Sequence, residues 1–205
     1  MKILALDLSS GRGSVAFCAG DETPFATTFA NDRKDSGQFF DQLRQTLAAH
    51  GQPERIVVGL GPGSYAGTRI AISAAIGLEV ATGAELVGLP SICAMKTEAI
   101  DYMVIGDARR QTFFFAQVSG RVCVTGPTLC REDELRERLT EITMPVFTTE
   151  LLPAFASATV AHPSASILAQ LAAGEHDDFR REPLEPLYLR EAHITQPKSG
   201  MIPQR

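Results

Sequence analysis

Two aspartates stand at equivalent places in the two halves of this chain. Asp7 closes the apolar run that begins at residue 2, and Asp107 closes the run that begins at residue 101. A polar turn follows each of them. Carboxylates on two sides of a cleft hold Mg²⁺ and nucleotide phosphates in phosphoryl-transfer proteins. The alternative is that each aspartate only caps its own turn.

The segment 59–72 (GLGPGSYAGTRIAI) is the second candidate for chemistry. Its glycines allow close backbone approach, and a helix that follows them offers free amides and a positive dipole end to an anion. It has neither the Gly-Lys-Ser/Thr of a Walker loop nor GxGxxG spacing. Small residues along the helix also allow close packing, which we favour because interior glycines need such a reason. The candidate nucleotide or structural residues are Asp7, Gly61, Gly63, Ser64, Gly67, Arg69 and Asp107.

Other reactive residue types form no catalytic pattern. The four histidines contain no HxxxH or HExxH pair, so no metal ligand is predicted. The order Gly-Pro-Gly-Ser-Tyr is not the G-x-S-x-G elbow of a hydrolase. Three arginines (Arg109, Arg110 and Arg121) form at most a modest basic group. We therefore expect no catalytic residue and no metal site.

The elements that position these residues alternate between strands and helices. Apolar runs predict strands at 2–8, 13–19, 25–30, 55–60, 86–88, 101–106, 145–148 and 158–161. Helical spacing and composition predict helices at 36–50 (capped by Asp35 or Ser36), 64–82, 90–99, 131–141 and 164–173. From residue 180 the proline-rich chain is predicted to cross the surface as an extended tail without a core, frayed beyond about Ile194.

The chain repeats its opening pattern after 100 residues. Ile3–Asp7 aligns with Met103–Asp107, and the same offset aligns Gly20 with Gly120. Two halves that each begin with strand, aspartate, turn and strand predict a duplicated α/β protein with a central cleft. Chance alignment of common strand-turn-strand units is the alternative. We place the subdomains at 1–100, with the glycine loop and partner-facing helices, and at 101–205, with the tail.

Composition bounds the class of protein. A hydrophobic content of 44% is enough for a core, and a net charge of -5 disfavours a broad basic surface for direct, strong RNA binding. The four cysteines form no CxxC pair and are expected to be reduced thiols in a cytoplasmic protein. No apolar run approaches the roughly 20 residues of a membrane span.

At residues 59–83 the sequence GLGPGSYAGTRIAISAAIGLEVATG resembles the signature of the TsaB (YeaZ) family. Further family blocks match at Asp7, at the Asp107–Arg109 segment and at the late block 185–190 (EPLYLR). The resemblance therefore spans the whole chain. The wider group is the glycoprotease-like branch of the actin-like ATPase superfamily. The chain departs from the family at 33–37, where Asp35 and Gly37 replace a His and a Glu, and at Tyr65-Ala66, which replaces Phe-Thr.

The resemblance implies a duplicated actin-like (ASKHA, ribonuclease-H-like) fold and a non-catalytic subunit. Family members pair with TsaD, which carries the metal and the transfer chemistry, and act with the ATPase TsaE. The complex makes threonylcarbamoyladenosine beside the tRNA anticodon, so tRNA is met only through the complex. No cofactor is expected on the isolated chain, and binding of ATP or ADP with Mg²⁺ at or near the partner interface is left open. Without TsaD, the exposed apolar helices are expected to self-associate.

Two apolar helices are the predicted interface with TsaD. The residues concerned are Phe39, Phe40, Leu43, Leu47, Ala71, Ala74, Ala75 and Leu78. Phe39 and Leu43 are equally well read as ordinary core, because one sequence does not separate inner from outer apolar stripes. Two other functions stay open: a small ATPase or phosphotransferase that uses Asp7 and Asp107, and a glycoprotease, for which no nucleophile or metal ligand is found.

Overall fold

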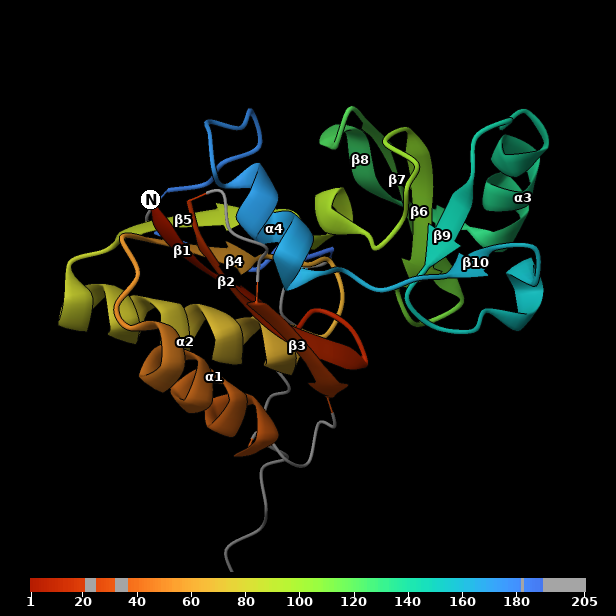
Figure 1. Ribbon diagram of the computed structural model, residues 1–205. Coiled ribbons are helices and arrows are strands. Elements are labelled where there is room, and N and C mark those ends of the chain that lie inside the picture. Colours follow the sequence, from red (N-terminus) through yellow and green to blue (C-terminus); the bar gives the residue numbers. More distant parts are fainter. Residues whose placement is uncertain (21–24, 32–36, 182, 190–205) are drawn as a thin grey trace, which may run out of the picture.

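The computed structural model describes residues 1–20, 25–31, 37–181 and 183–189. They form two lobes that lie side by side (Figure 1). Each lobe is built on a five-stranded mixed sheet. None of the helices in the described parts of the chain is long and apolar enough to cross a membrane.

The first lobe carries the Asp7 turn and the glycine segment. Its sheet has the strand order β3-β2-β1-β4-β5. The strands are β1 (Lys2–Asp7), β2 (Arg12–Ala19), β3 (Phe25–Ala30), β4 (Arg55–Gly59) and β5 (Glu85–Leu89). Helices α1 (Gly37–His50) and α2 (Tyr65–Thr82) cover one face and α4 (Ala165–Leu171) the other (Figure 1).

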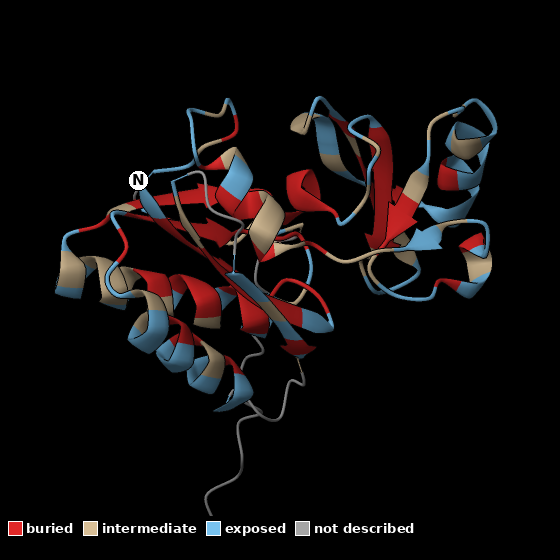
Figure 2. Ribbon diagram, in the orientation of Figure 1, coloured by how far each residue is buried: buried red, intermediate tan, exposed pale blue. Residues whose placement is uncertain are grey.

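Helices on both faces explain why β1 is apolar from residue 3 to residue 6. Leu4 and Leu6 point into the cluster under α1 and α2, whereas Ile3 and Ala5 point into the cluster under α4. Successive side chains of a strand alternate between faces, so a strand covered on both sides buries every residue. Figure 2 shows these central strands buried while the outer face of α1 is exposed.

The second lobe repeats the sheet of the first. Its strand order, β10-β9-β6-β7-β8, has the same topology when read from the other end. The elements are β6 (Tyr102–Asp107), β7 (Thr112–Ser119), β8 (Val122–Arg131), β9 (Val146–Thr148), β10 (Thr159–Val160), α3 (Glu132–Thr140) and the 3-10 turns η1 (Ser91–Ala94) and η2 (Pro153–Phe155). In both lobes the central strand pairs antiparallel with the next strand and parallel with a later one.

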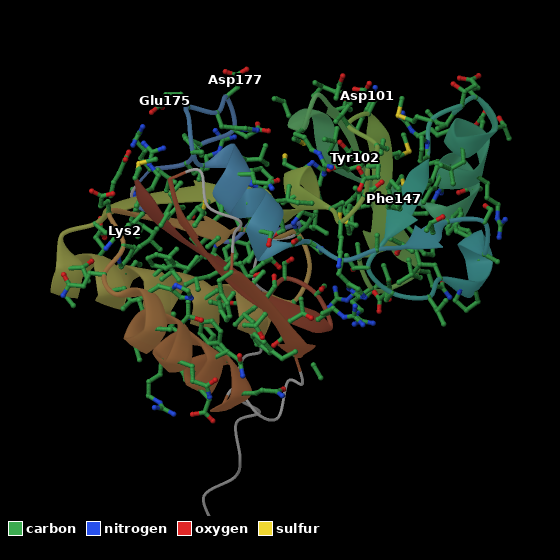
Figure 3. The ribbon with its side chains drawn as sticks, in the orientation of Figure 1. Lys2, Asp101, Tyr102, Phe147, Glu175 and Asp177 are labelled. Carbon is green, nitrogen blue, oxygen red and sulfur yellow. The ribbon has the colours of Figure 1, made fainter. Side chains whose placement is uncertain are left out.

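The second lobe has its own core on each face of its sheet. Tyr102 from β6 and Phe147 from β9 meet edge to face with ring centroids 5.6 Å apart, and both are labelled in Figure 3. On the opposite face Met103 and Ile105 pack with Leu135 of α3. Because α4 packs on the first sheet, the last part of the chain returns to the first lobe. The predicted boundary at residue 100 stays a prediction.

Three sequence predictions need correction. The helix predicted at 90–99 is only the turn η1, because Met95 pairs with Pro163 as a β-bridge where the chain crosses between the lobes. Strand β8 was not predicted, since its largely exposed residues lack an apolar run. The tail does contribute to a core: Leu184 is buried with the first-lobe cluster. The predicted fraying beyond Ile194 and the caps Asp35 and Ser36 lie outside the described residues.

The tail is held to the first lobe by backbone pairing. Arg180 and Gly88 exchange two backbone hydrogen bonds of 2.8 Å, so the tail covers the edge strand β5. The amide of Leu187 donates to Leu60 O at 2.8 Å. Since paired backbone groups and the buried Leu184 fix this segment, residues up to 189 reach the space between the lobes.

Candidate functional site: the cleft between the lobes

A cavity of about 640 Å³ lies between the two lobes. Most of its lining comes from the turn after β1, the start of α2, the turn after β6, the chain after β9, and the tail at 186–189. Its described lining consists of Ser9, Ser10, Gly11, Asn31, Leu60, Gly63, Ser64, Tyr65, Ala66, Thr68, Gly106, Asp107, Ala108, Arg109, Phe114, Thr149, Glu150, Pro186, Leu187, Tyr188 and Leu189. Ligand pockets are commonly of this size.

Asp7 does not face this cavity. Its side chain is fully buried, and its Oδ1 accepts from the amide (2.9 Å) and the hydroxyl (2.8 Å) of Ser9. A Cβ at Gly59 would lie 1.9 Å from Asp7 Oδ2, so this glycine lets β4 close over the carboxyl. Burial raises the pKa of Asp7, against the smaller opposing effect of the hydrogen bonds from Ser9, and Oδ2 has no hydrogen-bond partner among the described residues. Asp7 therefore acts as the internal brace of its turn.

Asp107 does line the cavity, and it is partly exposed. Its Oδ1 accepts from the amide of Arg109 at 2.7 Å, and its Oδ2 pairs with the Arg109 guanidinium at 3.0 Å. The structure thus does not bring the two predicted carboxylates together across the cleft, because one is sealed below the surface and the other is paired beside its own turn.

The glycine segment packs against the first turn. A Cβ at Gly63 would lie 2.0 Å from Ser9 O, and one at Gly67 would lie 2.2 Å from Leu8 O. The amide of Ser64 donates to Ser9 O at 2.6 Å, and Ser64 Oγ accepts from the amide of Gly67 at 3.3 Å. These glycines allow the backbone of the turn to rest on the start of α2, as the packing interpretation predicts.

Other amides of the two turns are also engaged within the chain. Besides Ser9 and Arg109, the amide of Arg12 donates to Ser10 Oγ at 3.2 Å and that of Ala108 to Thr112 O at 2.9 Å. A phosphate chain needs free donors and a cation, and these engaged amides are not free to donate to it. The described residues hold no group of three or more His, Cys, Asp or Glu suited to a metal. The two turns therefore give no specific support for a magnesium-bound triphosphate, while Arg109 and the start of α2 also belong to the lining.

Aromatic residues at the cleft were missed by the sequence analysis. Tyr65 and Tyr188 approach with ring centroids 5.4 Å apart, and both are about half exposed. Arg69 lies beside them: its Nη1 donates to Tyr65 Oη at 3.0 Å. Gly61, by contrast, is buried, and its amide donates to Ser91 Oγ at 2.9 Å. Tyr188 lies in the late block of the family signature, which was the only signal available.

The predicted interface residues divide into two groups. Four of them belong to the core of the first lobe, which corrects the prediction that they face a partner: Phe39, Leu43, Ala71 and Ala75. They point inward because α1 and α2 cover the apolar sheet with these faces. Phe40 is 49% exposed, and Leu47, Ala74 and Leu78 are half-buried at the edge of the same core.

The family model for TsaD, tRNA N6-adenosine threonylcarbamoyltransferase, matches residues 41–144, just over half of the 205 residues. This chain belongs to the TsaD family. A comparison with curated proteins finds no match.

Solved structures show the same fold in two proteins from Pseudomonas aeruginosa. One, an uncharacterized protein with similarity to the peptidase YeaZ, is 21% identical with a TM-score of 0.69, covering 92% of this chain and 99% of that one. The other, YeaZ, is 17% identical with a TM-score of 0.66, covering 84% of this chain and 91% of its own. The predicted duplicated actin-like α/β fold is confirmed. The resemblance to the TsaB (YeaZ) family is confirmed as well, because this TsaD-family chain has the fold of YeaZ.

Proposed function

We propose that this chain is a non-catalytic partner subunit of the TsaB type, which binds and stabilises TsaD in the complex that forms threonylcarbamoyladenosine in tRNA. Family membership supports the general role. The observation that carries the partner role is the outer face of α2, where an exposed glycine lies in the middle of a helix without any need for it inside this chain.

Gly77 is that glycine. Apart from its chain neighbours and the nearby backbone of α2, no atom of the described residues lies within 4 Å of where its Cβ would be. Glycine inside a helix costs about 1 kcal/mol relative to alanine, so a packing or backbone reason is expected. At Gly63 and Gly67 the reason lies within the chain, but at Gly77 it does not. Close approach of a helix from another protein supplies a reason, because a missing side chain lets two backbones come together.

The residues around Gly77 fit such a contact. The outer side of α2 carries five residues at helical spacing: Ile70, Ser73, Gly77, Val80 and Ala81. Ser73, Val80 and Ala81 are exposed, with Val80 at 81%, and Ile70 is half-buried. Phe40 adds an exposed aromatic ring on α1. This outer face replaces the inner residues as the proposed interface, and Phe40, Leu47, Ala74 and Leu78 remain at it or at its edge.

The other parts of the proposal follow from the same role. TsaE joins the complex, tRNA is met through the complex, and the protein works in the cytoplasm. A nucleotide with Mg²⁺, where one takes part, binds at or near the heterodimer interface. Without TsaD, the outer face of α2 pairs with a second copy, because an exposed apolar helix face finds the complement that is present.

An ATPase or phosphotransferase that uses Asp7 and Asp107 has less support. Asp7 is sealed beneath Gly59, and Asp107 is paired with Arg109. A glycoprotease activity has less support. The described residues contain no metal cluster. His162 Nδ1 lies 3.1 Å from Ser10 Oγ, but no carboxylate of the described residues is hydrogen-bonded to His162.

The test is co-expression with TsaD of the same organism, followed by size-exclusion chromatography with light scattering. We expect a one-to-one complex with the wild-type chain. Gly77→Leu should abolish it while the isolated chain keeps its melting temperature, because the substitution meets no neighbour and favours the helix. Leu151→Asp, at a residue 85% exposed in the second lobe, is the matched control and should leave the complex intact.

Two results would count against the proposal. A wild-type chain that ignores TsaD rejects the partner role, and a complex that survives both Gly77→Leu and Phe40→Asp places the interface elsewhere. Substitutions at Phe39 or Leu43 are unsuitable for this test, since both side chains are buried in the core and their loss would unfold the chain.

A further inference from the structure

The outer face of α2 has one end with large side chains and one end with small ones. Every fourth residue from 65 to 81 is exposed, so these residues form one ridge along the helix: Tyr65, Arg69, Ser73, Gly77 and Ala81. The last three are small and suit the close approach of another helix. The first two are large, so a partner that meets them needs a different kind of contact.

Tyr65 and Arg69 form a cluster with Tyr188 of the tail, which we call the tyrosine-arginine cluster. The two tyrosine ring centroids lie 5.4 Å apart, and both rings are about half exposed. The guanidinium carbon of Arg69 lies 5.2 Å from the centroid of the Tyr65 ring, and its Nη1 donates to Tyr65 Oη at 3.0 Å. Tyrosine and arginine are the residue types that often carry most of the binding energy of a protein interface.

Both segments that carry the cluster are fixed in place. The first turn of α2 is capped by Ser64 Oγ, which accepts from the amide of Gly67 at 3.3 Å. The tail is held by the buried Leu184 and by the amide of Leu187, which donates to Leu60 O at 2.8 Å. A contact surface that is already ordered loses little conformational entropy when a partner binds.

Arg69 indicates the charge of the group that the cluster receives. It is the only charged residue on the ridge, since Glu79, the other charged residue of α2, follows Gly77 by two positions and lies off the ridge. Among the described residues its contacts are with Tyr65, and no carboxylate pairs with it there. An arginine has five N–H donors in a planar arrangement, so most of them remain for a carboxylate. A polyanion such as RNA needs several basic groups, whereas a single arginine suits a single carboxylate.

We propose that the tyrosine-arginine cluster receives an acidic side chain of TsaD, at the opposite end of the interface from the close helix contact at Gly77. Arg69 pairs with the carboxylate, and the rings of Tyr65 and Tyr188 shield the pair from water. Arg69 and Gly77 are about 12 Å apart along the helix, so one interface of ordinary size includes both. This inference rests on the proposed partner role and adds the chemistry that the partner must present.

The test measures the affinity of purified TsaD for variants of the full chain by isothermal titration calorimetry. Arg69→Glu should weaken binding at least about 30-fold, the size of a hot-spot loss, because it places two negative charges together. Tyr188→Ala should weaken binding at least about fivefold, since it removes one shielding ring. Arg136→Glu, the same change of charge at an exposed residue of α3, is the control and should bind like the wild type.

Salt dependence separates the ion pair from a merely structural role of Arg69. Added salt should weaken the wild-type complex more than the complex of Arg69→Gln, because salt screens the attraction between the guanidinium and the carboxylate. The isolated variants should keep the melting temperature of the wild type, because Arg69 is exposed and Tyr188 is about half exposed.

The outcomes distinguish this inference from the proposed function. A wild-type chain that does not bind TsaD rejects the partner role and this inference with it. A complex that is lost in Gly77→Leu but keeps its affinity in Arg69→Glu and Tyr188→Ala overturns this inference and leaves the partner role intact. Equal salt dependence of the wild type and Arg69→Gln also overturns it, since no carboxylate would then pair with Arg69.

Discussion

The turns after Asp7 and Asp107 begin alike and end in different environments. Asp7 is paired in register with Ser14, whereas Asp107 is paired with Phe113, so the second turn is one residue shorter. The first turn is covered by β4 and the start of α2. In the second lobe the parallel neighbour of β6 is the short strand β9, which is followed by the 3-10 turn η2 where β4 is followed by the long helix α2. One carboxyl is buried for this reason, and the other stays at the surface of the cleft.

Backbone conformation shows the same difference. Three consecutive residues of the second turn have positive φ: Arg109 (66°), Arg110 (54°) and Gln111 (59°). Left-handed conformations are costly for residues other than glycine and cluster at functional sites. The first turn has no such residue in its described part. The same sequence pattern thus forms a buried, hydrogen-bonded turn in the first lobe and a turn with left-handed backbone in the second. The elements packed around each turn cause this difference.

The largest expected effect on stability is at Gly63, where the start of α2 packs on the turn after Asp7. Gly63→Ala should lower the free energy of unfolding by about 3–5 kcal/mol, because the new Cβ would meet the backbone oxygen of Ser9 at 2.0 Å. Chemical denaturation followed by circular dichroism measures it. Gly11→Ala is the control in the same turn region: apart from its chain neighbours, no described residue comes within 4 Å of its Cβ, and the effect should stay within about 1 kcal/mol. Equal effects of the two changes would contradict the packing role of Gly63.

The second expected effect is a difference in stability between alanine variants of the two aspartates. Asp7→Ala should cost about 1–3 kcal/mol, since it leaves the buried amide and hydroxyl of Ser9 without their acceptor. Asp107→Ala removes only an exposed ion pair and a turn contact and should cost less than about 1 kcal/mol. Parallel urea titrations compare the two, and an Asp107 effect as large as that of Asp7 would remove the distinction between the turns.

The pH dependence of folding stability tests the same difference between the two aspartates, because Asp7 is the buried one. Burial raises its folded pKa above the ordinary value, so the folded state holds the proton more tightly than the unfolded state. The resulting stabilisation is complete below the unfolded value of 3.8 and is lost as pH rises through the raised folded pKa. Asp7→Asn keeps an acceptor for Ser9 and has no charge to bury. The variant should therefore be at least as stable as the wild type at pH 7. Thermal melts should show that the difference in melting temperature between the variant and the wild type becomes smaller at acid pH. A large loss at pH 7 would show that the ionised carboxylate is needed.

The smallest expected effect is at the strained turn. Arg110→Gly should raise the free energy of unfolding by up to about 1 kcal/mol, because glycine adopts positive φ without the side-chain penalty. The melting temperature measures this change. The matched control is Arg131→Gly, an exposed arginine just before α3 without positive φ, which should not be stabilising. A loss of stability in Arg110→Gly would mean that the Arg110 side chain holds the turn.

The sequence by itself determined the local elements and their repetition. The apolar runs of β1 and β6, the small-residue helix α2 and the charged helix α3 follow from patterns of adjacent residues, since burial imposes periods of two or 3.6 on the chain. The offset of 100 residues predicted the duplication, and the two sheets have the same strand order. The resemblance supplied the actin-like fold.

Only the tertiary structure decided which faces those elements expose. Phe39 lies inside and Phe40 outside although they are neighbours on one helix. Asp7 is sealed because Gly59 and Ser91 arrive from 52 and 84 residues later in the chain, and Leu184 is buried because the tail pairs with Gly88. Contacts between distant segments set burial, and burial sets whether a carboxyl is charged or a glycine is needed.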